Sequence, residues 1–438
     1  MEYLNIIIQL FLFFVIFYFG IPVNKFLSTN NIKLNTIDNY TFNIIFYINF
    51  FLIISFFNFN ITKLIILYFT LLSILIIINI RFFFFEIKRL KIKFFFLSII
   101  FLITVIISVD ISNSITLGWD SQKFWIYKTI NFFDNGTIES LRYLDKGDGY
   151  DYPYLGSLLW AIYWKISFYN EEYFGRLFYA FIYIFSLLSM INRLNAPSHS
   201  KIIILLILVL LSYNYDYFGG EQDILLFCWL AFASALSLKI FKIKNNKELN
   251  FNLVLLILLC NLMIWTKAEG SVYAFIIILS LICFLRTKIS LKLILIISLI
   301  TLITIRVIVY KFHGLNIGVN SCCWNDLSIT GIYSKITFDR IFTILQYLVF
   351  AFLKNYLIIF SMVLFIIKKN KFKDSNYILY SYITILLCLA FFFTAYLLTD
   401  ANLVFMLKTG LDRLLFSITP FFIIIIIDYL SNNKLKFN

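Results

Sequence analysis

The amino-acid sequence predicts an all-α polytopic membrane protein, and three observations carry this prediction. Of the 438 residues, 62% are hydrophobic, and the mean hydropathy is +0.91. Only 14% are charged, whereas soluble domains carry about 25%. Apolar runs of roughly 20 residues, long enough to cross a bilayer, recur along the whole chain. A soluble domain of this composition would expose too much apolar surface, so the soluble classes are excluded.

Thirteen apolar runs are the candidate membrane spans. They lie at 3–22, 41–58, 61–84, 94–110, 172–191, 202–218, 222–240, 251–266, 270–285, 290–310, 352–367, 377–398 and 411–430. No small-residue cleavage site follows the first run, so we expect a retained span there. The first three spans carry almost no charge. We therefore assign 1–93 to accessory N-terminal spans and 94–438 to the module that carries the chemistry.

Clusters of Lys and Arg predict the orientation of the spans. They occur at 88–93, 239–247, 286–292, 368–373 and 434–436. Cytoplasmic loops carry an excess of these residues, and an even number of predicted spans separates each cluster from the next. We therefore expect the N-terminus outside and the C-terminus inside. The same rule explains most of the net charge of +14, so nucleic acid is not an expected partner.

Five loops are then predicted to lie on the other, outer side of the membrane. They are 111–171, 212–223, 266–270, 311–351 and 399–412. The first is the longest, and it contains an apolar, aromatic-rich stretch at 154–168. If this stretch crossed the membrane, every later basic cluster would lie outside. We therefore expect a helix in the membrane interface, with Trp160, Tyr163 and Trp164 at headgroup depth.

The candidate functional residues are the ionisable groups at the points where outer loops meet spans. A charge at the edge of the membrane is energetically costly, so its presence suggests a function. The candidates are Asp120, Arg176, Glu221, Asp223, Lys267, Glu269 and Arg413. Asp110 is an alternative to Asp120. Each also has a structural explanation: a helix N-terminus favours an acid such as Asp223, and Lys267 can simply neutralise Glu269.

A zinc site is not expected from this sequence. His199 and His313 are far apart, and the neighbouring Cys322 and Cys323 do not have the spacing of metal ligands. Carboxylates can instead hold a divalent cation such as Mg²⁺ or Mn²⁺. Glu221 and Asp223 are the candidates for that role, with orientation of an acceptor as the alternative.

Taken in order, these motifs resemble the GT-C superfamily of polyprenyl-phosphate-sugar glycosyltransferases. They are most similar to the aminoarabinose lipid A transferase and protein O-mannosyltransferase branch. The matching elements are Asp120 after a span, Tyr152-Pro153 before the aromatic stretch, Arg176, Asp223, and Arg413 with the later Pro420. The resemblance covers roughly 94–430. The chain departs from the family in its three additional spans and in lacking an Asp-Glu pair at the first motif.

The resemblance implies a GT-C-type bundle in which the loop 111–171 carries catalysis. It implies inverting transfer of a sugar from a polyprenyl-phosphate donor to a lipid, glycan or protein acceptor. The site would face the periplasm or cell exterior of a bacterial plasma membrane, or a eukaryotic lumen. The implied catalytic residues are Asp120, as general base, and Asp223. The implied substrate-binding residues are Arg413, Lys267, Glu269, Arg176, Tyr152 and Glu221.

Two other classes of function remain open at this stage. A transporter or flippase of lipid-linked glycans would place charges near the bilayer midplane, often in two symmetric halves. Here the charges gather on one predicted side, and no internal repeat is visible in the sequence. A non-catalytic factor in envelope-polysaccharide assembly would tolerate Asp120→Asn, whereas a glycosyltransferase that uses Asp120 as its base would not.

Overall fold

The computed structural model describes residues 2–18, 35–78, 94–113, 116–144, 152–167, 169–243, 245–285, 287–315, 328–372 and 376–432. Within these residues every regular element is a helix and none is a strand, which confirms the predicted all-α class. Several features named above lie outside the described residues. They are the basic clusters at 88–93 and 434–436 and the pair Cys322-Cys323.

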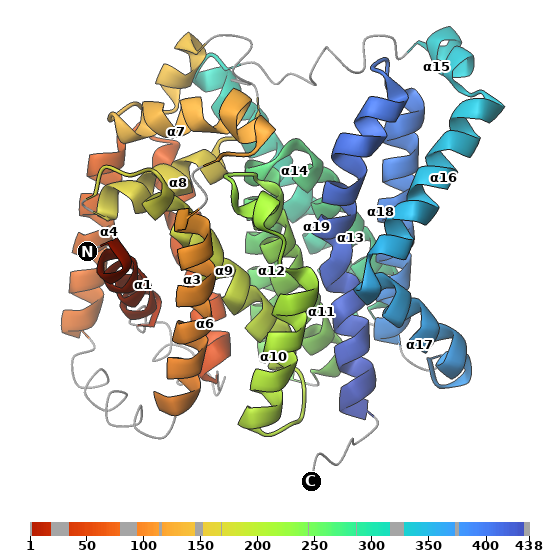
Figure 1. Ribbon diagram of the computed structural model, residues 1–438, viewed down its shortest axis with the longest axis horizontal. Helices are drawn as coiled ribbons and strands as arrows, with labels where there is room; N and C mark the ends of the chain where they lie inside the picture. Colours follow the sequence, from red (N-terminus) through yellow and green to blue (C-terminus); the bar gives the residue numbers. More distant parts are fainter. Residues whose placement is uncertain are drawn as a thin grey trace.

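The helices follow one another along the chain as in Figure 1. They are α1 (Glu2–Tyr18), α3 (Thr36–Ser55), α4 (Ile61–Ile78), α6 (Phe94–Asn113), the π-helix η1 (Ser121–Trp125), α7 (Ile126–Phe133), the 3₁₀ helix η2 (Glu139–Tyr143), α8 (Leu155–Ile166), α9 (Tyr173–Ile191), α10 (Ser198–Ser212), the 3₁₀ helix η4 (Tyr215–Phe218), α11 (Asp223–Lys242), α12 (Asn246–Thr266), α13 (Ala268–Phe284), α14 (Ile289–Phe312), α15 (Ile329–Lys335), α16 (Phe338–Lys354), α17 (Tyr356–Phe372), α18 (Asn376–Leu398) and α19 (Leu403–Asn432).

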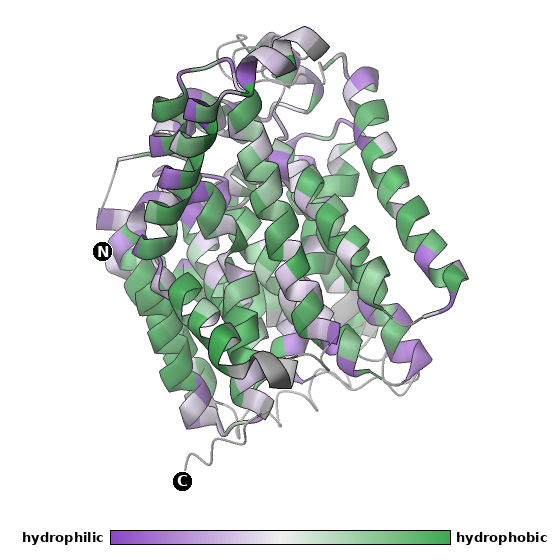
Figure 2. Ribbon diagram, turned by 90° about the vertical axis from the view of Figure 1, so that its right-hand side faces the viewer, coloured by the Kyte–Doolittle hydropathy of each residue, from purple (hydrophilic) through white to green (hydrophobic). Residues whose placement is uncertain are grey.

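Eight of the described helices are long and apolar enough to cross a membrane: α3, α6, α9, α11, α12, α14, α18 and α19. The pair α16 and α17 makes a ninth if it counts as one span bent by 90°. In Figure 2 hydrophobic residues dominate the long helices, and hydrophilic residues gather mostly toward their ends. The chain is thus an integral membrane protein with several spans. The count of thirteen stays a prediction, although α1, α4, α10 and α13 are shorter apolar helices at predicted runs.

Helices α9 and α11 form the centre of the bundle. Every residue of α9 is buried, and so is nearly all of α11. A helix that is apolar on all sides is expected in such a position. Helix α11 packs chiefly against α9, α19 and α12. Because of this packing, the first residue of α11, Asp223, lies beside α19 and beside the turn between α12 and α13.

The N-terminal helices pack into the same core. The Gln9 side chain on α1 donates to the carbonyl oxygen of Tyr163 on α8 at 3.1 Å. On α12, the Asn261 amide donates to Asn49 Oδ1 of α3 at 2.9 Å. These helices therefore share the interior with later parts of the chain. The division into 1–93 and 94–438 remains a prediction.

The aromatic stretch at 154–168 forms α8, which lies across the direction of α3 in Figure 1. The prediction that its rings sit among lipid headgroups is wrong for two of them. Trp160 and Tyr163 are fully buried. Tyr163 stacks on Phe178 at 3.8 Å between ring centroids, and the Trp160 indole donates to the carbonyl of Glu172. Aromatic composition alone does not distinguish rings that face lipid from rings that face neighbouring helices.

Candidate functional site

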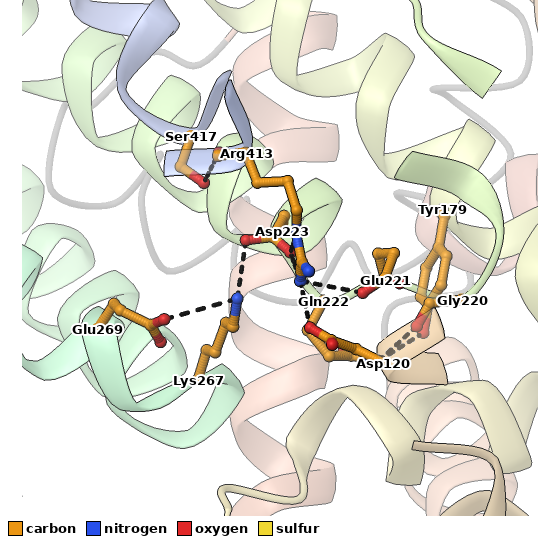
Figure 3. Close-up of polar contacts among 10 residues, drawn as sticks. All are labelled: Asp120, Tyr179, Gly220, Glu221, Gln222, Asp223, Lys267, Glu269, Arg413 and Ser417. Carbon is orange, nitrogen blue, oxygen red and sulfur yellow. Dashed lines mark hydrogen bonds and ion pairs between the residues drawn. The ribbon is translucent and has the colours of Figure 1, made fainter. Parts of the chain in front are cut away.

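Arg413 lies at the centre of a cluster of charged side chains (Figure 3). Its Nη2 atom donates to Asp120 Oδ2 at 2.5 Å and to Asp223 Oδ2 at 2.6 Å. The same nitrogen lies 3.1 Å from Glu221 Oε2. Three carboxylates from two separate loops and a helix start thus meet at one guanidinium. We call the set of ion-paired residues Asp120, Glu221, Asp223, Lys267, Glu269 and Arg413 the Arg413 cluster.

Lys267 extends this cluster on the other side of Asp223. Its Nζ atom donates to Asp223 Oδ1 at 2.9 Å and lies 3.6 Å from Glu269 Oε1. Both oxygens of Asp223 are therefore engaged, one by each cation. Six of the eight residues predicted from the sequence thus converge on one site.

A backbone contact between two loops sets Asp120 beside Glu221. The N–H of Gly118 donates to the carbonyl oxygen of Gly219 at 2.8 Å. A Cβ atom on Gly219 would lie 2.9 Å from the nitrogen of Gly118, and one on Gly118 would lie 2.2 Å from Glu221 Oε1. A side chain at position 219 would press on the backbone of the other loop, and one at position 118 would press on the Glu221 side chain, so glycine suits both positions.

Helix ends position two of the charges. Asp223 is the first residue of α11, where the positive end of the helix dipole favours a carboxylate. Lys267 separates α12 from α13 and has an extended backbone, with φ −152°. The sharp change of direction there points its side chain at Asp223. Arg413 projects from within α19, and its carbonyl oxygen accepts from Ser417 at 3.1 Å.

The cluster has a buried side and an accessible side. The side chain of Asp223 is completely buried, and that of Lys267 nearly so. Asp120 and Arg413 retain 19% and 22% of their side-chain exposure. A ligand can therefore reach Asp120 and Arg413 directly, while Asp223 and Lys267 support them from behind.

The cluster holds four carboxylates and two cations, so its negative charge is not balanced by side chains alone. Burial raises the pKa of Glu221 to about 7, helped by Asp120 and Asp223 and opposed by Arg413. Burial lowers the pKa of Lys267, but Asp223 and Glu269 outweigh this and hold the pKa above its ordinary value. Lys267 thus stays charged, while Glu221 exchanges a proton near neutral pH.

A divalent cation does not fit the present arrangement of the carboxylates. Asp223 accepts from Lys267 with one oxygen and from Arg413 with the other. Across the part of the chain that the structure describes, no group of three or more His, Cys, Asp or Glu side chains is arranged to hold a metal ion.

Arg176, predicted to bind substrate, is not an ion-pair partner of the described residues of the Arg413 cluster, and its role in binding stays a prediction. It is fully buried, pairs with Glu172 at 2.6 Å and donates to the carbonyl oxygen of Phe218 at 3.3 Å. Phe218 ends the turn that leads to Glu221. Arg176 is thus placed to hold the loop that carries Glu221.

Tyr152 and Asp110 also have structural partners. The Tyr152 ring packs against Phe124 and Trp125 of η1, and its carbonyl oxygen accepts from Lys128 at 2.7 Å. Tyr152 therefore supports the helical segment that begins after Asp120. Asp110, the alternative to Asp120, accepts a hydrogen bond from the hydroxyl of Tyr213.

Gln222 and Tyr179 are buried residues near the site that the sequence did not predict as functional. The Gln222 amide donates to the hydroxyl of Tyr179 at 3.4 Å and to the carbonyl oxygen of Gly220 at 3.1 Å. Gly220 has φ +87°, a conformation that favours glycine. The Gly219-Gly220 doublet signals a turn in the sequence, but nothing in the pattern of residues reveals that Gln222 fixes it from within.

The chain was compared with models of protein families, with curated proteins and with solved structures. No family model, no curated protein and no solved structure matches it. Membership of the GT-C superfamily therefore stays a prediction from the ordered motifs of the sequence.

Proposed function

We propose that the protein is a membrane glycosyltransferase that moves a sugar from a polyprenyl-phosphate donor to an acceptor, with inversion. The observation that carries this proposal is that Asp120 and Asp223 pair with Arg413, while Lys267 pairs with Asp223. These residues come from four segments far apart in the sequence. They supply a reachable carboxylate, a reachable guanidinium and a buried ammonium at one place.

Arg413 is the proposed ligand of the donor phosphate. A guanidinium binds phosphate oxygens in pairs, and such charge-assisted contacts are strong. Arg413 is held by three carboxylates. A phosphate that takes the place of Asp120 on Arg413 would leave that carboxylate available as a base. Binding of the donor would thus prepare the site for the reaction.

The transfer step follows from these roles. The acceptor hydroxyl attacks the anomeric carbon and loses its proton to the Asp120 carboxylate. The bond between the anomeric carbon and the phosphate oxygen breaks, and its electron pair leaves with polyprenyl phosphate. Arg413 and Lys267 stabilise the charge that develops on that oxygen. Asp223, which bonds to both cations, orients them. We propose a bacterial plasma membrane as the location, with the site on the exterior side.

The test is sugar transfer by purified, reconstituted protein. Radiolabelled polyprenyl-phosphate sugars are incubated with the protein and a membrane extract, in parallel with the corresponding labelled nucleotide sugars. We expect label to move to an acceptor from the lipid-linked donor and not from the nucleotide sugar. Transfer from nucleotide sugars, or no transfer from any lipid-linked sugar tried, would contradict the proposal.

A second candidate function is the transport of lipid-linked glycans, and one observation favours it. Helices α16 and α17 meet at a 90° break beside Asn355. Broken helices line the substrate sites of many transporters. Vesicles that carry a labelled lipid-linked glycan distinguish the two functions. A transporter moves the intact molecule across the bilayer, whereas a glycosyltransferase separates the sugar from its lipid.

A further inference from the structure

A groove lies between α16 and α19. Its volume is about 400 Å³. Tyr347, Ala351, Leu407 and Leu411 form apolar walls, and Lys354 and Lys408 add positive charge. Leu407, Leu411 and Ala351 are buried, while both lysines are exposed. The groove thus combines an apolar interior with a cationic rim.

The groove and the Arg413 cluster lie on different sides of α19. Asp412 lines the groove, whereas Arg413, the next residue, bonds to Asp223 of α11. Consecutive helical residues point about 100° apart because a turn holds about 3.6 residues. A molecule in the groove would therefore not occupy the site assigned to the donor phosphate.

The corner between α16 and α17 shapes the mouth of the groove. Lys354 is the last residue of α16, and the chain then turns by 90°. The Asn355 side chain donates to Thr419 Oγ1 of α19 at 3.3 Å and anchors the corner. Next to the lysine, Phe350 and Leu353 expose more than half of their surface. The groove is thus continuous with an apolar outer face of the protein.

Among the residues that the structure describes, the positive charges at the rim exceed their carboxylate partners. Lys354 lies 3.8 Å from Asp412, but their side chains are 74% and 53% exposed, and such a pair stabilises little. Lys408 adds a second positive charge. Charged side chains on the outside of apolar helices are costly unless they meet a polar partner. Two cations against one carboxylate complement an anion, and the apolar walls complement hydrocarbon chains.

We propose that the groove between α16 and α19 binds a membrane lipid with an anionic headgroup. The headgroup lies between Lys354 and Lys408, and a hydrocarbon chain packs against Ala351, Leu407 and Leu411. Phosphatidylglycerol is the simplest lipid with this chemistry. The site is separate from the donor site, and lipid binding there does not depend on sugar transfer.

Native mass spectrometry of the purified full chain, titrated with phosphatidylglycerol, tests this proposal. One tightly retained lipid is expected, with phosphatidylcholine binding more weakly. Lys354→Gln and Lys408→Gln should each weaken binding about fivefold, the effect of one basic residue on an anionic lipid. Asp412→Asn should strengthen binding because it removes a repelling charge. Lys311→Gln, an exposed lysine on α14, is the matched control and should change nothing.

A variant that keeps the charges tests the apolar part of the groove. Ala351→Phe fills the interior and should lower phosphatidylglycerol binding while both lysines remain. Circular dichroism checks that the helices are retained. Equal retention of phosphatidylcholine, or unchanged binding in both lysine variants, would overturn the proposal. Loss of the lipid to added inorganic phosphate at similar concentration would also overturn it, because it would identify a site for a soluble anion.

Discussion

A cluster of charged side chains lies at each end of helix α11, and the two clusters differ in their balance of positive and negative charges. Asp223, its first residue, belongs to the Arg413 cluster. Near its other end, Lys239 belongs to a second set of ion-paired residues. We call this set, Asp38, Arg193, Lys239 and Glu248, the Arg193 cluster. Its two cations match its two carboxylates, whereas the Arg413 cluster has two cations and four carboxylates.

This difference fits a structural role for the Arg193 cluster and the proposed ligand-binding role for the Arg413 cluster. Arg193 bonds to Asp38 at 2.5 Å, and Lys239 links Asp38 and Glu248 at 3.8 and 3.3 Å. These pairs join α3, α11 and α12 and leave no excess charge. In the Arg413 cluster, one guanidinium serves three carboxylates. Such an arrangement can exchange one anionic partner for another.

The largest expected effect comes from the two arginines. Arg413→Gln should reduce sugar transfer by about 10²–10³-fold, the usual loss when one group that stabilises developing charge is removed. Arg193→Gln should leave the rate of sugar transfer within about twofold of that of the parent protein. This corresponds to a free-energy change well below the 1.4 kcal/mol of a tenfold change. Initial rates at saturating acceptor provide the measurement. Equal losses in both variants would remove the distinction between the clusters.

The two lysines give a smaller contrast, in stability. Lys267→Gln breaks a nearly fully buried pair with Asp223 and should lower the free energy of unfolding by about 3 kcal/mol. Lys239→Gln removes longer and more exposed pairs and should cost about 1 kcal/mol or less. Thermal unfolding in the same detergent compares the two. A more damaging Lys239→Gln would show that the Arg193 cluster is the more tightly coupled.

The smallest effect is a dependence on pH through Glu221. Its pKa rises from 4.5 to about 7 in the folded protein. Its contribution to stability is therefore fully present below about pH 4.5 and is lost as the pH rises through about 7. Above pH 7 the ionised Glu221 carboxylate should repel the anionic donor and raise its KM. If bound donor shifts the pKa of Glu221 by one unit, the KM should change by about tenfold. Glu221→Gln should flatten this rise, and Glu248→Gln should not.

The sequence predicts which residues meet at the site better than it predicts their contacts. The alternation of basic loops assigns Asp120, Asp223, Lys267 and Arg413 to one side of the membrane. Charges predicted on the same side of a compact bundle are expected to lie close together. The pairing of both Asp223 oxygens depends on how α11, α12 and α19 pack, which no local pattern encodes.

Two other features lay beyond the reach of sequence patterns. Arg176 resembles a phosphate ligand in its position, but its partner Glu172 is one helical turn away and takes up its charge. Trp160 and Tyr163 match an interfacial pattern, but α9 packs against both rings and α1 packs against Tyr163. In both cases the outcome depends on neighbours that are set by long-range packing. Apolar composition gives the helices themselves, because that signal is local.

The central claim is that the Arg413 cluster is the catalytic site, and Asp120→Asn tests it most directly. The substitution keeps the size of the side chain and removes the base. We expect transfer from a labelled polyprenyl-phosphate sugar to fall by about 10²–10⁴-fold, with normal insertion and helix content, while the matched Asp38→Asn variant retains activity. Normal transfer by Asp120→Asn would contradict the account.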